Sequence, residues 1–163
     1  MTARATPLGT TIKLERPDQH DVFMLLEARD EHSAALYPPE SNHALDLAAL
    51  LDPAVTFLVA RTDGVAVGCV ALLRQAGGAG EIKSMWVEPE HRGTGLGRAL
   101  LAAVEAEASA QGVGTLRLET GTRQPEALGL YRAAGYSEIG PFGAYRPDPL
   151  SVFMEKSLAA GPS

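Results

Sequence analysis

The sequence predicts a mixed α/β domain built on one central sheet with helices on both faces. In its first half, two β-rich runs at residues 55–60 and 65–73 flank Thr62-Asp63-Gly64, a pattern typical of an antiparallel hairpin. In its second half, strand patterns alternate with helix patterns in the order β–α–β–α–β. Antiparallel strands followed by alternating elements predict a mixed sheet covered by helices.

Composition limits the class of protein. The chain has 163 residues, of which 45% are hydrophobic, and a net charge of −6. We expect one domain over residues 1–163, with flexible tails at 1–9 and 159–163. The negative charge argues against nucleic acid as the main partner. The single cysteine, Cys69, and the absence of an apolar run of about 20 residues predict a soluble cytoplasmic protein without a membrane partner.

The N-terminal part begins with an alternating strand pattern at residues 10–16, followed by a helix from residue 17 to about 35. Prolines 38 and 39 stop any helix, so a loop must follow Tyr37. Ser41 or Asn42 is expected to cap a short helix that carries Leu45, Leu47, Leu50 and Leu51.

The remaining elements follow from turn signals and periodicity. A glycine-rich turn at residues 77–80 leads into a strand at 81–87. A helix from Leu96 to about Gln111 is ended by Gly112. Strand 115–120, a helix at 124–134 and a last strand at 152–156 complete the prediction.

The turn between strand 81–87 and the following helix contains three glycines, Gly93, Gly95 and Gly97. Free backbone N–H groups at a helix N-terminus form a binding site for a phosphate or pyrophosphate. No Lys-Ser/Thr pair follows Gly97, which excludes a P-loop, and the turn falls too late in the chain for a dinucleotide fold. The glycines alone would also fit a plain tight turn.

Two motifs favour an anion-binding turn over a plain tight turn. The pattern Arg92-x-x-Gly95-x-Gly97, after a Met-x-Val-x-Pro strand, resembles the acetyl-CoA signature of the GNAT superfamily of N-acetyltransferases. Downstream, Ala-Leu-Gly-Leu-Tyr-Arg-Ala-Ala-Gly-Tyr at residues 127–136 resembles that family's A-x-x-L-Y-x-x-x-G-F/Y segment. The resemblance covers residues 10–158, with the first half matching by layout. It implies a mostly antiparallel sheet of about six to seven strands, splayed in the middle, with about four helices.

The resemblance implies acetyl-CoA as cosubstrate, with its pantetheine arm lying along the strand that contains Met85 and Val87. The Val87 N–H is then the donor that stabilises the oxyanion, and the pyrophosphate lies on the glycine turn. Gln124 stands where many relatives have Asn. The residues so assigned to acetyl-CoA are Met85, Trp86, Val87, Arg92, Gly93, Thr94, Gly95, Leu96, Gly97, Arg98, Gln124 and Tyr131.

Tyr131 matches the family tyrosine that acts as general acid toward the departing thiolate. A phenol with an unperturbed pKa of about 10 is protonated at neutral pH and can donate to sulfur. Glu81 is the first candidate for the general base, acting through water, and Glu119 on the neighbouring strand is its rival. No His/Cys/carboxylate cluster has the spacing of metal ligands, so no metal is expected.

The acceptor is expected to be the primary amine of a small or amino-acid-like molecule, attacking the thioester directly through a tetrahedral intermediate. Its candidate contacts lie in the variable loops: Tyr37, Glu40, Asn42, Glu119 and Tyr145. Arg123 or Arg146 could bind an acceptor carboxylate. Two alternatives stay open, a protein or peptide N-acetyltransferase and a non-catalytic acyl-CoA-binding regulatory domain. The last strand and the loop that precedes it, with Phe142, Tyr145 and Arg146 (the late loop), are candidates for a homodimer contact.

Overall fold

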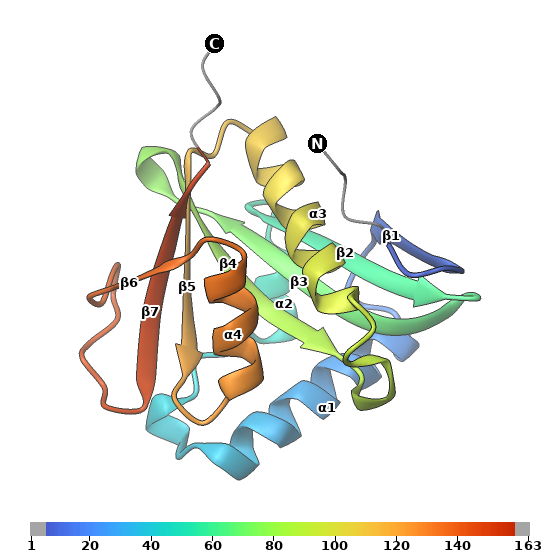
Figure 1. Cartoon of the computed structure of the whole chain (residues 1–163), viewed down its shortest axis with the longest axis horizontal. Helices are drawn as coiled ribbons and strands as arrows, with labels where there is room; N and C mark the ends of the chain where they lie inside the picture. The colour runs from blue at the N-terminus through green and yellow to red at the C-terminus, as the bar shows by residue number, and fades with distance from the viewer. Residues whose placement is uncertain (1–5, 159–163) are drawn as a thin grey trace.

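The computed structural model describes residues 6–158, which form a seven-stranded sheet with helices on both faces (Figure 1). The strands are β1 (Thr10–Leu14), β2 (Val55–Thr62), β3 (Val65–Arg74), β4 (Ala79–Val87), β5 (Thr115–Gly121), β6 (Ser137–Ile139) and β7 (Ser151–Ser157). The α-helices are α1 (His20–Leu36), α2 (Leu47–Leu50), α3 (Leu96–Ala110) and α4 (Pro125–Ala133). The predicted fold class is confirmed.

The sheet divides between β4 and β5. The strand order is β1-β2-β3-β4-β5-β7-β6, and β4–β5 is the one parallel pairing among the described strands. It extends only from Ala79–Glu81 on β4 to Thr115–Arg117 on β5, after which the two strands diverge (Figure 1). This confirms the splay that the family resemblance implied.

A bulge in β4 accounts for the divergence. The β3–β4 register shifts between Cys69 and Ala71, and Ser84 on β4 has a φ of 56° although it is not glycine. A bulge of this kind bends a strand and increases its twist. Ser84 is buried, and its carbonyl oxygen accepts a hydrogen bond from the Cys69 thiol at 3.3 Å. The bend therefore turns the end of β4 away from β5.

Each face of the sheet carries its own apolar core. Alternate residues of β2 and β3 point to opposite faces, as the period of a strand requires. Leu58, Val70 and Leu72 pack in the core that includes α3 and α4, whereas Phe57 and Val59 pack in the core beneath α1 and α2. Helices α1 and α2 thus lie on the face opposite α3 and α4, as Figure 1 shows.

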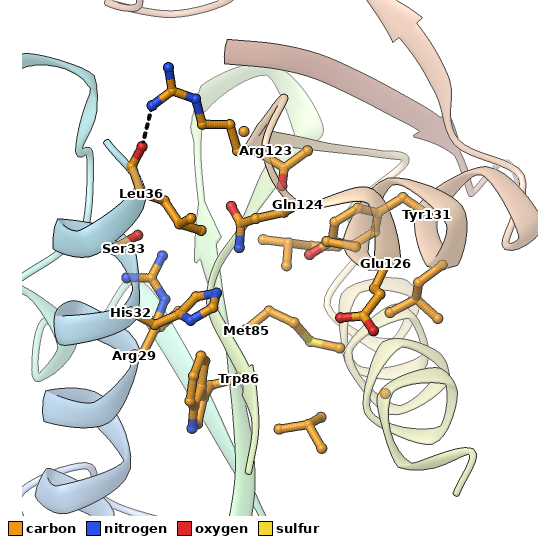
Figure 2. A pocket seen from close by; sticks show the side chains of 18 of the residues that line it. Arg29, His32, Ser33, Leu36, Met85, Trp86, Arg123, Gln124, Glu126 and Tyr131 are labelled. Atoms are coloured by element: carbon orange, nitrogen blue, oxygen red, sulfur yellow. Dashed lines mark hydrogen bonds between the residues drawn. The ribbon is translucent and has the colours of Figure 1, made fainter. Parts of the chain in front are cut away.

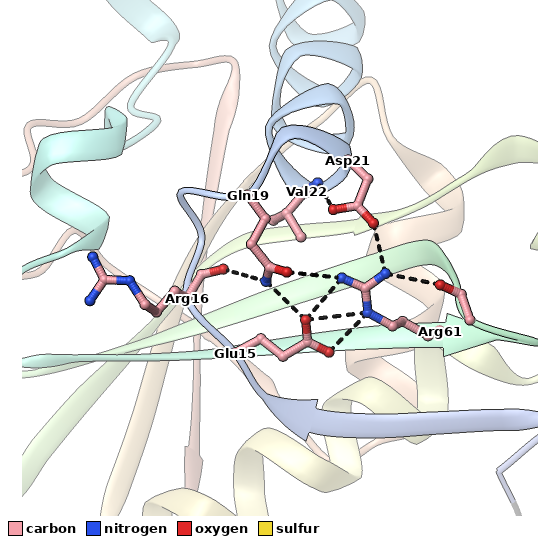
Figure 3. A network of polar contacts seen from close by, with 7 residues as sticks. Glu15, Arg16, Gln19, Asp21, Val22 and Arg61 are labelled. Carbon is pink, nitrogen blue, oxygen red and sulfur yellow. Dashed lines mark hydrogen bonds and ion pairs between the residues drawn. The ribbon is translucent and has the colours of Figure 1, made fainter.

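A polar network fixes the start of α1 (Figure 3). The Arg61 guanidinium on β2 binds the Glu15 carboxylate through Nε and Nη2, each at 3.0 Å, and the Asp21 carboxylate at 2.7 Å. It also donates to Gln19 Oε1 at 3.3 Å and to the Gly64 carbonyl at 3.0 Å. Arg61 lowers the pKa values of Glu15 and Asp21, because it favours their charged forms. The first turn of α1 is thereby tied to β1 and β2.

Several predicted boundaries are wrong in detail. The short helix α2 is capped by Asp46, whose Oδ1 accepts from the Ala49 N–H at 2.8 Å, and not by Ser41 or Asn42. Ser41 instead ends a 3₁₀ turn and donates to Asp148 at 2.6 Å. The prediction missed the edge strand β6, since its three residues are too few for a periodic pattern.

The predicted tails lie largely outside the described residues, which exclude 1–5 and 159–163. Within the described part of the N-terminal tail, backbone hydrogen bonds run from Thr10 N to Pro7 O at 3.0 Å and from Asp63 N to Gly9 O at 3.1 Å. Residues 7 and 9 are therefore bonded to the first strand and to the β2–β3 turn. Within residues 6–158, no helix is long and apolar enough to cross a membrane.

Candidate active site

A cavity of about 780 Å³ occupies the gap between β4 and β5. Its wall includes residues 82–87 of β4 and 119–121 of β5, together with the glycine turn and the first half of α4. Figure 2 shows side chains of α1 on one side of this cavity and those of α4 on the other. A volume of this order is typical of ligand-binding pockets.

The glycine turn opens one end of the cavity. Gly93 and Gly95 have φ values of 77° and 91°, which side-chain-bearing residues rarely adopt, and Gly95 caps α3. A Cβ added at either glycine would meet no atom within 4 Å, so the backbone faces open space. Since the first N–H groups of a helix have no partner within it, this end of α3 can bind an anion.

Most of the predicted cofactor residues line the cavity, but Thr94 and Leu96 do not. The Thr94 hydroxyl donates to the His91 carbonyl at 2.6 Å and thus shapes the turn. Leu96 is 1% exposed and belongs to the core under α3. For these two residues only the backbone remains available to a ligand.

Two arginines stand near the turn. Arg92 lies with its guanidinium carbon 4.7 Å from the centre of the Trp86 ring, and its Nε donates to the Val87 carbonyl at 3.0 Å. Its terminal nitrogens have no partner among the described residues. Arg98, on the first turn of α3, also lines the cavity. Both cations can bind phosphate oxygens.

The backbone of β4 faces the gap at Val87. The Glu88 N–H bonds to the Val67 carbonyl on β3 at 2.9 Å, and Val87 pairs with Gly68. Because N–H groups alternate in direction along an antiparallel strand, the Val87 N–H points away from β3. No backbone partner for this N–H is recorded within residues 6–158, so it can act as a donor on the side of the gap.

Tyr131 on α4 lines the same cavity (Figure 2). It is 6% exposed, and burial raises the pKa of its hydroxyl to about 12. The hydroxyl makes no hydrogen bond within residues 6–158. Its ring packs edge-on against Tyr136, whose own hydroxyl donates to Glu105 at 2.8 Å. Tyr131 is therefore a neutral phenol whose hydroxyl has no hydrogen-bond partner within residues 6–158, whereas the Tyr136 hydroxyl is bonded to Glu105 in the core.

The two candidate bases lie in different surroundings. Glu81 is 4% exposed and does not line the cavity; it accepts hydrogen bonds from Tyr145 at 2.5 Å and Gln75 at 3.1 Å and pairs with Lys83 at 3.4 Å. Glu119 does line the cavity, and its carboxylate accepts from the Ser151 hydroxyl at 2.8 Å. Burial raises the pKa of Glu119. The structure thus brings Glu119, and not Glu81, into the cavity with Tyr131.

The predicted acceptor residues also divide into those that line the cavity and those that do not. Tyr37 lines the cavity, but its hydroxyl accepts from the Arg123 N–H at 3.0 Å and donates to Gln124 at 3.2 Å. Asn42 lines the cavity, whereas Glu40 is exposed outside it and Tyr145 bonds to Glu81 beneath it. Tyr37 and Gln124 together join the end of α1 to the start of α4.

The sequence prediction missed the contribution of α1. Four of its residues line the cavity, and their spacing of i, i+3, i+4 and i+7 puts them on one face of the helix: Arg29, His32, Ser33 and Leu36. This face is continuous with the apolar stripe that the first half of α1 buries. In the sequence, these residues appear as the second half of an apolar stripe on the helix whose members become polar.

A splayed sheet, a glycine turn capping α3 and an unpartnered phenol across the gap define an acyl-CoA-dependent N-acyltransferase. The chain belongs to the acetyltransferase (GNAT) family, whose sequence model matches residues 22–136.

Known relatives agree with this assignment. The chain is 50% identical over 151 residues to a protein of Azospirillum brasilense named IAA acetyltransferase, covering 92% of this chain and 99% of that protein. A crystal structure from Klebsiella pneumoniae, described as an acyl-CoA N-acyltransferase, is 40% identical, with a TM-score of 0.78 over 91% of this chain and 97% of that one. The PaiA N-acetyltransferase of Thermoplasma acidophilum, solved with coenzyme A, shares the fold at 18% identity, with a TM-score of 0.70 over 92% and 99% of the two chains.

Proposed function

We propose that this enzyme transfers the acetyl group of acetyl-CoA to the primary amine of a small, amino-acid-like acceptor by direct attack. The observation that carries the proposal is that the glycine turn, Val87, Tyr131 and Glu119 all line one cavity. Such a set can bind a pyrophosphate and act on a thioester at the same site.

The donor would bind by its pyrophosphate to the open N-terminus of α3, with Arg92 and Arg98 adding positive charge. The pantetheine amides would bond to the β4 backbone at Met85 and to the Val87 carbonyl, in the gap that β5 leaves, so that the Val87 N–H stays available to the thioester. This placement brings the thioester carbonyl to the Val87 N–H, which would stabilise the oxyanion of the tetrahedral intermediate.

We assign the general base to Glu119 rather than to Glu81. Glu119 would take the proton of the acceptor ammonium through water, the amine nitrogen would bond to the acetyl carbon, and the carbon–sulfur bond would then break. Tyr131 would give its proton to the leaving thiolate, the resulting tyrosinate would take the second proton that the new amide nitrogen loses, and Glu119 would release the first proton to solvent. Glu81 has its carboxylate oxygens bound by Tyr145, Gln75 and Lys83, so its proposed role is to hold the late loop against β4.

The enclosure of the cavity favours a small acceptor. The 3₁₀ turn before α2 is tied to the late loop by the Ser41–Asp148 hydrogen bond of 2.6 Å, and the Tyr37 hydroxyl ties α1 to the α4 start. Both links hold loops beside the cavity in place, and we take this as support for a small acceptor over a polypeptide.

The direct test is release of CoA thiol from acetyl-CoA in the presence of amino acids, polyamines, aminoglycosides or peptides. We expect release with small amines and loss of most of it in Tyr131→Phe. Tight CoA binding without release in any mixture would instead identify a regulatory acyl-CoA-binding protein, and release only with peptides would identify a protein acetyltransferase.

A further inference from the structure

Arg29 occupies a core-facing position of α1. The first half of the helix buries Val22, Leu25 and Leu26, which are 0%, 4% and 8% exposed. Arg29 follows them by seven, four and three residues, which places it on the same face of the helix. An apolar residue would be expected there if the sheet beneath were closed. The arginine instead lies where the face of α1 reaches the cavity (Figure 2).

The Arg29 guanidinium is poorly satisfied by the protein. Its side chain is 22% exposed, and its one ion pair within the described chain is with Asp30 at 3.4 Å, a residue that is itself 62% exposed. A guanidinium carries five N–H donors. Donors left without partners away from bulk water cost free energy, so a cation on a cavity wall whose recorded partner is one exposed carboxylate at 3.4 Å indicates an anionic ligand.

The other cations of the cavity wall have identifiable roles. Lys83 donates to Tyr145 at 2.7 Å and to the His43 carbonyl at 2.9 Å, and Arg123 donates to the Leu36 carbonyl at 2.6 Å. Arg92 and Arg98 stand at the glycine turn, where the pyrophosphate is expected. Apart from the two arginines at the glycine turn, Arg29 is the wall cation whose closest recorded contact is the longest within residues 6–158, which makes it our candidate to bind the acceptor.

Arg29 also shares the cavity with an acid. Burial raises the pKa of Glu119, and the Ser151 hydrogen bond is the largest effect that opposes this rise, with smaller contributions that include the charges of Lys83 and Arg29. Yet no ion pair of 4.0 Å or less joins Arg29 to Glu119. The Glu119 carboxylate and the Arg29 guanidinium are therefore two separate charged groups of the cavity wall, which also carries Glu126 and other cations.

We propose that the acceptor is a free amino acid whose carboxylate is bound by Arg29 while its amine faces Glu119 and the thioester. This inference rests on the proposed function and adds the substrate class. A planar guanidinium binds a carboxylate with two parallel hydrogen bonds, which fixes both distance and orientation. A zwitterionic substrate pairs with both Arg29 and Glu119 at once, whereas a simple amine leaves Arg29 without an anionic ligand.

The test compares three forms of each acceptor: the amino acid, its carboxamide and the amine that lacks the carboxyl group, together with a short peptide. With the whole enzyme and saturating acetyl-CoA, we expect kcat/KM from CoA thiol release to favour the amino acids by about 10- to 100-fold. Arg29→Gln should raise the KM for the amino acids by a similar factor and leave the other acceptors nearly unchanged. Arg29→Lys should retain part of the preference.

Arg132→Gln serves as the control, because Arg132 is exposed on α4, pairs only weakly with Glu138 at 4.0 Å and does not line the cavity. It should keep the full preference. Equal rates with acids and carboxamides, or an equal loss for both in Arg29→Gln, would overturn the role of Arg29 and leave the acetyltransferase function standing. No thiol release by the wild-type enzyme with any small amine would refute the proposed function itself.

Discussion

Two arginines lie at helix α1, and the number of partners that the chain gives to each of them differs. At its N-terminal turn, Arg61 is surrounded by the carboxylates of Glu15 and Asp21 and by the Gln19 amide (Figure 3). Two turns further along, Arg29 has only the exposed Asp30 at 3.4 Å and borders the cavity (Figure 2). The first cation has its partners supplied by the fold. The second borders the cavity, where a bound ligand and not the chain would supply its partner.

The comparison separates residues that hold the structure from residues that await a ligand. Saturated polar groups such as Arg61, Glu81 and the Tyr37 hydroxyl join distant segments of the chain. Unsaturated groups such as Arg29 and the Tyr131 hydroxyl border the cavity. Changing a group of the first kind should cost stability, and changing one of the second kind should cost activity.

The largest expected effect concerns Tyr131. Tyr131→Phe keeps the ring packing and removes only the free hydroxyl, so kcat should fall by about 10²- to 10⁴-fold with little change in melting temperature. Steady-state kinetics over a pH series would measure it. Tyr136→Phe is the matched control, because it removes a hydroxyl that is already bound to Glu105; an unchanged kcat in Tyr131→Phe would contradict the general-acid role.

A smaller kinetic effect is expected for the base. The rate should fall as pH drops through the pKa of Glu119, which burial raises above its ordinary value of 4.5, because protonation removes the base. Glu119→Gln should lower kcat by about 10²-fold and abolish this acidic limb. Glu81→Gln is the counterpart: if it abolished the limb while Glu119→Gln kept it, the base would be Glu81.

Some of the residues that face the ligand could be predicted from the sequence, and others could not. The glycine turn and the Tyr131 segment are local patterns, so they identify the donor site without any knowledge of the fold. Arg29 was not predicted, because the sequence does not show that the polar half of the α1 stripe reaches the gap where β4 and β5 diverge. Glu81 is the first candidate for the base in the sequence because it begins the central strand, where relatives often carry a glutamate. The hydroxyl that binds its carboxylate belongs to Tyr145, 64 residues away in the chain, and no local pattern indicates that contact.

The stability side of the comparison is tested at Gly121. A Cβ at this position would collide with the Tyr37 hydroxyl, which sits directly against the glycine. Gly121→Ala should displace Tyr37, break its bonds to Arg123 and Gln124, and destabilise the protein by about 1–3 kcal/mol. Urea unfolding would measure the loss. Wild-type stability in this variant would show that the Tyr37 link does not hold α1 to α4.

The smallest expected effect is a change in acid stability. Arg61 lowers the pKa values of Glu15 and Asp21 below their ordinary 4.5 and 3.8, so their contribution is fully present above those values. It is lost as pH falls through the lowered values in the folded protein. The free energy of unfolding, measured between about pH 6 and pH 3, should therefore drop less steeply in Arg61→Gln than in the wild type. An equally steep drop in the variant would contradict this network.

The most direct test of the account compares the free energies of unfolding of Arg61→Gln and Arg29→Gln without ligands. Arg61→Gln should lose about 1–2 kcal/mol, because two carboxylates and an amide lose their shared partner. Arg29→Gln should be as stable as the wild type or slightly more so, because it removes a charge that the fold leaves unpaired. If Arg29→Gln lost as much stability as Arg61→Gln, Arg29 would be a structural residue and the distinction between the two arginines would be wrong.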